Sequence, residues 1–141
     1  MTDDMELSSG IAAFEARDYT KALRLLTPLA HKGIADAQYR VGMVFQNGLG
    51  RVKNYEEGFR WMKAAADQGH AYAQHGLGIM YLYGEGVAKN EAEAAKWFSF
   101  AAEAGLAGAQ MTLGMLYENG QGVEKDPEKA RYWYQQAEDN S

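Results

Sequence analysis

The sequence contains no cysteine and only two prolines among its 141 residues. Without cysteine the chain has no disulfide bond, no thiolate metal site and no cysteine nucleophile. No apolar run approaches the length of a transmembrane helix, and the acidic start Met1–Glu6 lacks the basic and apolar parts of a signal peptide. We therefore expect no membrane partner, and a cytoplasmic location (periplasmic or secreted if a leader has been removed).

Positive charge is also scarce, with 14 Lys and Arg against 19 Asp and Glu and a net charge of -5. Nucleic-acid binding needs clustered positive charge, so this balance predicts no nucleic-acid partner. Hydrophobic residues make up 47% of the chain, which is enough apolar surface to fold rather than stay disordered. The 16 glycines are abundant and indicate a backbone requirement that recurs along the chain.

A 36-residue repeat explains the glycines. The three tryptophans, Trp61, Trp97 and Trp133, lie 36 residues apart, and glycines recur at the same spacing without insertion from residue 35 onward. We predict repeats over 35–70, 71–106 and 107–141, preceded by an N-terminal capping helical hairpin over 1–34, all within one domain.

Each repeat is predicted to form two helices. In residues 71–106, apolar residues at helical spacing run from Ala71 to Tyr83, and a Gly-x-Gly loop then ends the first helix. Asn90, with Glu93 three residues later, is a typical N-cap of the second helix, and Gly105 closes it. The chain should therefore contain eight helices in four pairs.

A glycine inside each first helix indicates close approach of the two helices. Gly42, Gly78 and Gly114 recur there, although glycine costs about 1 kcal/mol relative to alanine in a helix interior. We expect the tryptophan ring of the second helix to lie across this glycine.

The recurring pattern Ala-x-Ala-Gln-x-x-x-Gly-x-x-(Phe/Tyr)-x-x-Gly-x-Gly-x-x-Lys-(Asn/Asp), followed by Trp, resembles the Sel1-like repeat. The segment Asp18–Ala22 with Phe14 is similar to an ordinary tetratricopeptide unit. The resemblance implies an all-α fold, a right-handed alpha-alpha superhelix (solenoid) of four helix pairs whose first helices form a concave face. It also implies an adaptor or scaffold that binds other proteins. Arg51 departs from the pattern, because Val87 and Val123 hold its position in the later repeats.

Positions that differ between repeats are the candidates for function, since identical positions are explained by stacking. On the first helices the candidate partner-binding residues are Tyr39, Arg40, Met43, Asn47, Tyr72, His75, Ile79, Leu82, Tyr83, Met111 and Met115. Aromatic, Arg and Met side chains are typical of surfaces that bind a peptide or a helix. Met43, Ile79 and Met115 fit a groove or the core equally well, whereas Tyr39, Arg40, His75, Leu82 and Tyr83 are expected to be exposed. Arg40 with Asn47 is a candidate grip for an acidic group.

No catalytic residue, cofactor or metal site is predicted. His70 and His75 are five residues apart, without an acid at ligand spacing. We therefore expect a non-enzymatic module that binds a peptide or helix of another protein. The alternative is a small-molecule or cell-wall-fragment binding protein or hydrolase, for which His75 beside Tyr39 and Tyr72 is the candidate. Self-association is a further possibility, although polar Gln135, Gln136, Glu138 and Asp139 suggest a C-terminal end suited to water.

Overall fold

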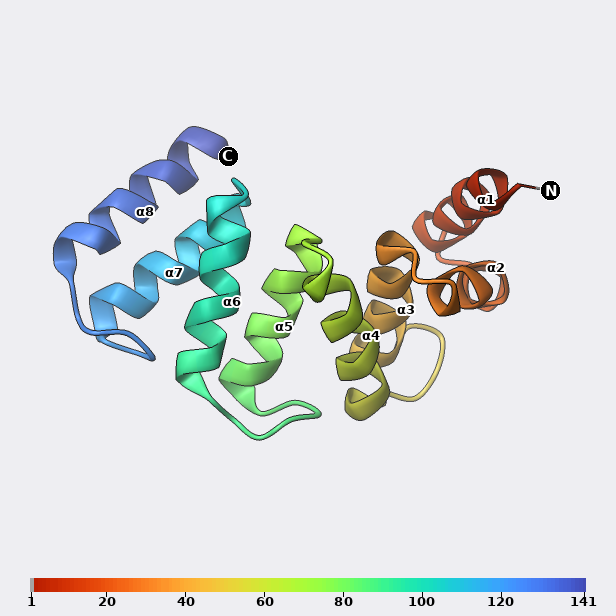
Figure 1. Cartoon of the computed structure of the whole chain (residues 1–141), viewed down its shortest axis with the longest axis horizontal. Coiled ribbons are helices and arrows are strands. Elements are labelled where there is room, and N and C mark those ends of the chain that lie inside the picture. The colour runs from red at the N-terminus through yellow and green to blue at the C-terminus, as the bar shows by residue number, and fades with distance from the viewer. Residues whose placement is uncertain (1) are drawn as a thin grey trace. The chain divides into compact units, whose positions relative to one another are not determined.

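The computed structural model describes residues 2–141, and within them it contains eight helices and no strand (Figure 1). Consecutive helices form pairs, as the sequence predicts. The helices are α1 (Asp3–Glu15), α2 (Tyr19–His31), α3 (Ala35–Asn47), α4 (Tyr55–Asp67), α5 (Ala71–Tyr83), α6 (Glu91–Glu103), α7 (Ala107–Asn119) and α8 (Pro127–Asn140).

The second helix of the repeat over 71–106 begins at the predicted cap, Asn90, and equivalent residues cap α4 and α8. The Asn54 side chain accepts a hydrogen bond from the backbone N–H of Glu57 at 3.1 Å, and Asn90 accepts one from Glu93 at 3.0 Å. Asp126 caps α8 in the same way. These bonds satisfy backbone donors that have no partner within the helix, which explains why each second helix starts where it does.

The two glycines of each Gly-x-Gly loop have different roles. Gly48 and Gly120 end α3 and α7 in the left-handed conformation, with φ of 64° and 66°. Gly122 also has a positive φ, and a Cβ atom there would collide with the backbone carbonyl of Glu91. The loop therefore packs directly on the start of the second helix of the preceding repeat, which only glycine permits.

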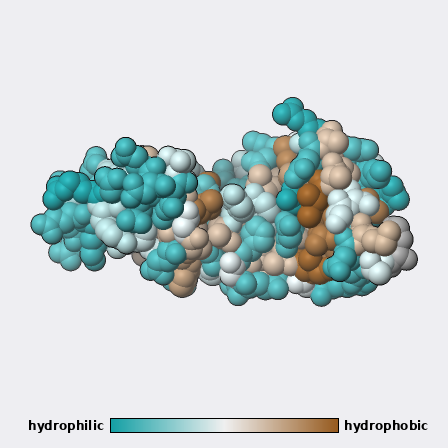
Figure 2. All heavy atoms as spheres, turned by 90° about the horizontal axis from the view of Figure 1, so that it is seen from above, coloured by the Kyte–Doolittle hydropathy of each residue, from teal (hydrophilic) through white to brown (hydrophobic). Residues whose placement is uncertain are grey.

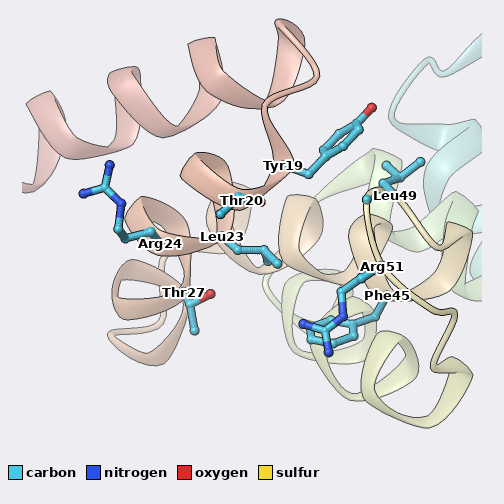
Figure 3. Close-up of a pocket in the computed structure, with 9 residues that line it drawn as sticks. Tyr19, Thr20, Leu23, Arg24, Thr27, Phe45, Leu49 and Arg51 are labelled. Carbon is cyan, nitrogen blue, oxygen red and sulfur yellow. The ribbon is translucent and has the colours of Figure 1, made fainter.

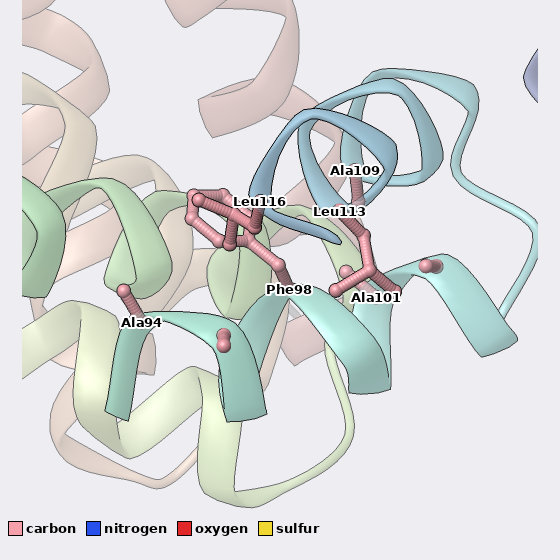
Figure 4. Close-up of a cluster of buried hydrophobic side chains, with 8 residues drawn as sticks. Ala94, Phe98, Ala101, Ala109, Leu113 and Leu116 are labelled. Atoms are coloured by element: carbon pink, nitrogen blue, oxygen red, sulfur yellow. The ribbon is translucent and has the colours of Figure 1, made fainter. Parts of the chain in front are cut away.

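The chain divides into two compact units, Met1–His70 and Ala71–Ser141. In the first unit, Leu26 and Leu29 of α2 are buried against Val41 of α3. In the second unit, Phe98 of α6 is buried against Leu113 of α7 (Figure 4). Each unit thus has a core between the second helix of one repeat and the first helix of the next.

The prediction that tryptophan lies across the helix glycine is wrong. A Cβ on Gly78 would lie 3.0 Å from the ring of Phe98, the residue after Trp97. The neighbours of Gly42 and Gly114 include Met62 and Tyr134, which occupy the same position of the repeat. Because successive helical residues point about 100° apart, the residue after the tryptophan faces the first helix.

No helix within residues 2–141 is both long enough and apolar enough to cross a membrane. Figure 2 shows that hydrophilic residues cover most of the face that it displays, with hydrophobic residues gathered in a band across part of it.

Candidate functional site

The eleven candidate residues fall in both units, so each unit is described by itself. Tyr39, Arg40, Met43 and Asn47 lie on α3 in the first unit, and the other seven lie on α5 and α7 in the second.

Arg40 is held by its own unit. Its Nε donates a hydrogen bond to Asp36 Oδ1 at 3.0 Å, and its guanidinium lies 5.1 Å from the centre of the Phe14 ring. Only 18% of the Arg40 side chain is exposed. Asn47 donates to the carbonyl of Met43 instead of forming a site with Arg40. The predicted grip on a partner's acidic group is therefore not formed here.

Tyr39 and His75 occupy the same position of the repeat, and both are half-buried rather than exposed. The Tyr39 ring stacks on His70 with the ring centres 4.7 Å apart, and the His75 ring meets the Phe98 ring edge-on at 5.5 Å. Burial lowers the pKa of the His75 imidazole. Burial also lowers the pKa of His70, in spite of the opposing attraction of Asp36. The position serves packing, which corrects the expectation of exposure.

The expected exposure of Arg40 and Leu82 is likewise wrong, because Leu82 is half-buried against the α6–α7 core. Met43, Ile79 and Met115 occupy the same position of the repeat. Of these three, Ile79 packs against the same core and belongs largely to the interior. Met115 is 49% exposed. Met43 is half-buried.

One hollow in the second unit brings three candidate residues together. We call it the α5–α7 hollow; its volume is about 260 Å³. It is lined by Leu82 and Tyr83 of α5, by Lys89 of the following loop, by Thr112, Met115 and Leu116 of α7, and by Gln121. Tyr83 is 68% exposed at its edge, as the sequence predicts.

The remaining candidates of the second unit lie elsewhere. Met111, 47% exposed, lines a separate hollow with Tyr134 and Ala137 of α8. Tyr72 is exposed on α5. The residues of the alternative function, Tyr39, Tyr72 and His75, do not come together within either unit, since Tyr39 lies in the first.

The α5–α7 hollow is suited to holding an apolar side chain. Leu82, Met115 and Leu116 give it an apolar lining, and Lys89 and Gln121 add a positive charge and an amide. No group of three or more His, Cys, Asp or Glu residues able to hold a metal ion occurs in the part of the chain that the structure describes.

Comparison between repeats missed Lys89, Leu116 and Gln121. Lys89 is identical to Lys53 and Lys125, and a search for differences passes over such a position. Gln121 lies in the Gly-x-Gly loop, where it differs from Leu49 and Glu85. The sequence therefore does carry a signal for Gln121, in a loop and outside the predicted helices.

A family model described as the Sel1 repeat matches residues 10–34, 35–70, 71–106 and 107–141. The chain belongs to the Sel1 repeat family. The match includes residues 10–34, so the N-terminal hairpin that resembles a tetratricopeptide unit is itself a Sel1 repeat. The family assignment made from the sequence motif is confirmed.

Solved structures share the fold. A Sel1 repeat protein from Oxalobacter formigenes is 36% identical, with a TM-score of 0.90 over 96% of this chain and 56% of that one. The protein c5321, a protective antigen of uropathogenic Escherichia coli strains with an SLR fold, is 35% identical, with a TM-score of 0.92 over 99% of this chain and 31% of that one. This chain therefore spans about half of the first protein and under a third of the second.

A more distant structure, Helicobacter pylori cysteine rich protein B (hcpB), is 19% identical, with a TM-score of 0.70 over 88% of this chain and 89% of that one. No curated protein matches the chain. The predicted all-α solenoid of four helix pairs is confirmed as the fold class of this Sel1 repeat protein. Sel1 repeat proteins are commonly non-catalytic scaffolds for protein interactions, which agrees with the general function predicted from the sequence.

Proposed function

We propose that this Sel1 repeat protein is a non-enzymatic interaction module that binds a segment of another protein in the α5–α7 hollow. The observation that carries the proposal is the pair of exposed apolar side chains, Tyr83 and Met115, at the edge of an apolar hollow. Large apolar side chains exposed side by side mark interaction sites more often than single exposed ones do.

The size of the hollow limits what can bind. About 260 Å³ accommodates one or two large apolar side chains of a peptide or an amphipathic helix, rather than a whole domain. Tyr83 offers a rigid aromatic surface and Met115 an adaptable one, a combination that suits an anchor residue. Lys89 at the same hollow favours an acidic or carbonyl group next to that anchor.

The test uses a double variant, Tyr83→Asn with Met115→Gln. Asparagine occupies the position of Tyr83 in two other repeats, as Asn47 and Asn119, so the helix should tolerate the change. The control is Tyr132→Gln with Met111→Gln, because Tyr132 and Met111 are about as exposed but lie outside the hollow.

Peptides would be selected on the wild-type protein from a random displayed library and then titrated against all three proteins. We expect the selected peptides to carry a large apolar anchor, and the hollow variant to bind them at least about tenfold more weakly. The control should bind them like the wild type. Equal binding by the hollow variant, with circular dichroism showing an intact fold, would overturn the proposal.

A further inference from the structure

Another hollow lies in the first unit, between α2 and the loop that follows α3 (Figure 3). We call it the α2–loop hollow; its volume is about 550 Å³. Leu23, Phe45 and Leu49 provide apolar lining, and Arg24 and Arg51 add two positive charges. Figure 3 shows the Arg51 guanidinium against the Phe45 ring and Arg24 on the other side of the hollow in that view.

The equivalent place in the second unit, two repeats further along, is held together differently. Gln121, at the position of Leu49, donates a hydrogen bond to Glu91, at the position of Tyr19, with a length of 2.7 Å. Val123, at the position of Arg51, packs against the α6–α7 core. The first unit lacks this bond between loop and helix and carries a charged residue in place of the valine. Stacking of the repeats does not require the first unit to differ from the second at this surface.

The two arginines of this hollow, Arg24 and Arg51, pair with no carboxylate among the described residues. In the second unit Lys96, at the position of Arg24, pairs with Glu93 at 3.3 Å. The position of Glu93 is held by Lys21 in α2, so Arg24 has a second base beside it instead of an acid. Arg51 lies over the Phe45 ring at 4.5 Å. Lys21 likewise forms no ion pair with a carboxylate in the part of the chain that the structure describes.

The charge of the first unit also favours an acidic ligand. Residues 1–70 contain nine acidic and nine basic residues, whereas residues 71–141 contain ten and five. The whole net charge of -5 therefore comes from the second unit. An acidic ligand meets no net repulsion from the first unit itself, and two arginines without a carboxylate partner attract it.

We propose that the α2–loop hollow binds an acidic segment of a protein partner. Carboxylates of the segment would pair with Arg24 and Arg51, and an apolar side chain between them would rest on Leu23 and Leu49. Arginine suits this role, because it stacks on an aromatic ring and still offers N–H donors at its edge. The apolar lining distinguishes this ligand from nucleic acid, for which phosphate contacts dominate affinity. This site is separate from the α5–α7 hollow and does not depend on the function proposed there.

The experiment measures binding of a labelled peptide, Glu-Glu-Leu-Phe-Glu-Glu, to the full chain by fluorescence anisotropy. The test variant is Arg51→Val with Arg24→Gln. Valine occupies the position of Arg51 in the two later repeats, so the variant should fold. The matched control is Arg60→Gln, which removes an exposed base of the same unit that pairs with Glu57 outside the hollow. A second peptide has glutamine in place of every glutamate.

We expect the acidic peptide to bind, to bind about tenfold more weakly to the Arg51 and Arg24 variant, and to weaken as salt is raised. The Arg60 variant and the α5–α7 hollow variant should bind the acidic peptide like the wild type. The result for one proposed site can therefore be read independently of the result for the other. Absence of binding, equal binding of the glutamine peptide, or unchanged binding by the variant would overturn the proposal.

Two further outcomes would assign the hollow to another occupant and overturn the peptide proposal. If light scattering shows a dimer that the Arg51 and Arg24 variant abolishes, the ligand is the acidic second unit of another copy. If a single-stranded oligonucleotide competes with the peptide at equal concentration, the hollow recognises negative charge without the apolar contact.

Discussion

At the scale of single residues, one position of the repeat has different neighbours in three of the repeats. Tyr39 stacks on His70, and His75 meets Phe98 edge-on, while Met111 at the same position lines an open hollow. The residue type follows the surroundings: aromatic rings where another ring is in contact, and a flexible thioether where the side chain is half exposed.

We expect His75 to make the stability of the fold depend on pH. Burial lowers its pKa in the folded state below the ordinary value of about 6.5, so the unfolded chain binds the proton more readily. The contribution of neutral His75 is therefore fully present above about pH 6.5 and is lost as the pH falls through and below that value. His75→Met, the residue that the fourth repeat carries at this position, should flatten the stability profile between about pH 7.5 and pH 5.5.

Urea unfolding at a series of pH values, followed by circular dichroism, measures this difference. Parallel profiles for the wild type and His75→Met would show that His75 is not responsible for the pH dependence.

At the scale of helices and loops, the caps and glycines decide where each helix begins and ends. The loop after α7 lies on the start of α6, and Gly122 allows that contact because it has no Cβ. A glycine that closes a second helix, such as Gly105, has a positive φ of 93° but open space around it. The two kinds of glycine thus recur along the chain for different physical reasons. One needs only the positive φ, and the other needs the positive φ together with space for a close backbone contact.

Gly122→Ala should cost more stability than Gly105→Ala. Alanine at Gly105 meets only the strain of a positive φ, about 1–2 kcal/mol. Alanine at Gly122 adds a collision with the Glu91 backbone, for a total of at least about 3 kcal/mol. Chemical denaturation of both variants gives the two values, and equal losses would mean that the loop moves away from α6 without cost.

At the scale of the whole molecule, the chain consists of two compact units with different charge. Repeat proteins are held together by contacts between neighbours, so a local defect need not spread through the entire chain. The first unit is neutral overall and carries the α2–loop hollow, whereas the acidic second unit carries the α5–α7 hollow. The two proposed binding surfaces therefore lie on units of different net charge.

Phe98→Ala tests this independence. Phe98 is fully buried among α5, α6 and α7, so the truncation should cost about 3–5 kcal/mol. Hydrogen exchange read by mass spectrometry should show faster exchange in α6 to α8, with α1 to α3 close to the wild type. Equal acceleration in α1 to α3 would show that the chain unfolds as one cooperative unit.

The candidate site could be predicted from the sequence only in part. Tyr83, Met115 and Leu82 were identified because they differ from their counterparts in other repeats, and they do line one hollow. The same rule also selected Tyr39 and His75, whose differences reflect ring contacts inside the units. A residue that varies between repeats is not fixed by the stacking contacts that all repeats share. The variation does not reveal which other residue its side chain contacts.

The sequence by itself determined the repeat length, the eight helices, their caps and the Sel1 family, because these depend on spacing and on local backbone chemistry. The tertiary structure decided which ring faces the helix glycine, with Phe98 in place of Trp97, and that Arg40 is bound by Asp36. It also decided that Arg24 and Arg51 line one hollow. Such contacts join residues distant in the chain, and the free energy of each depends on the distance and burial that only the folded arrangement sets.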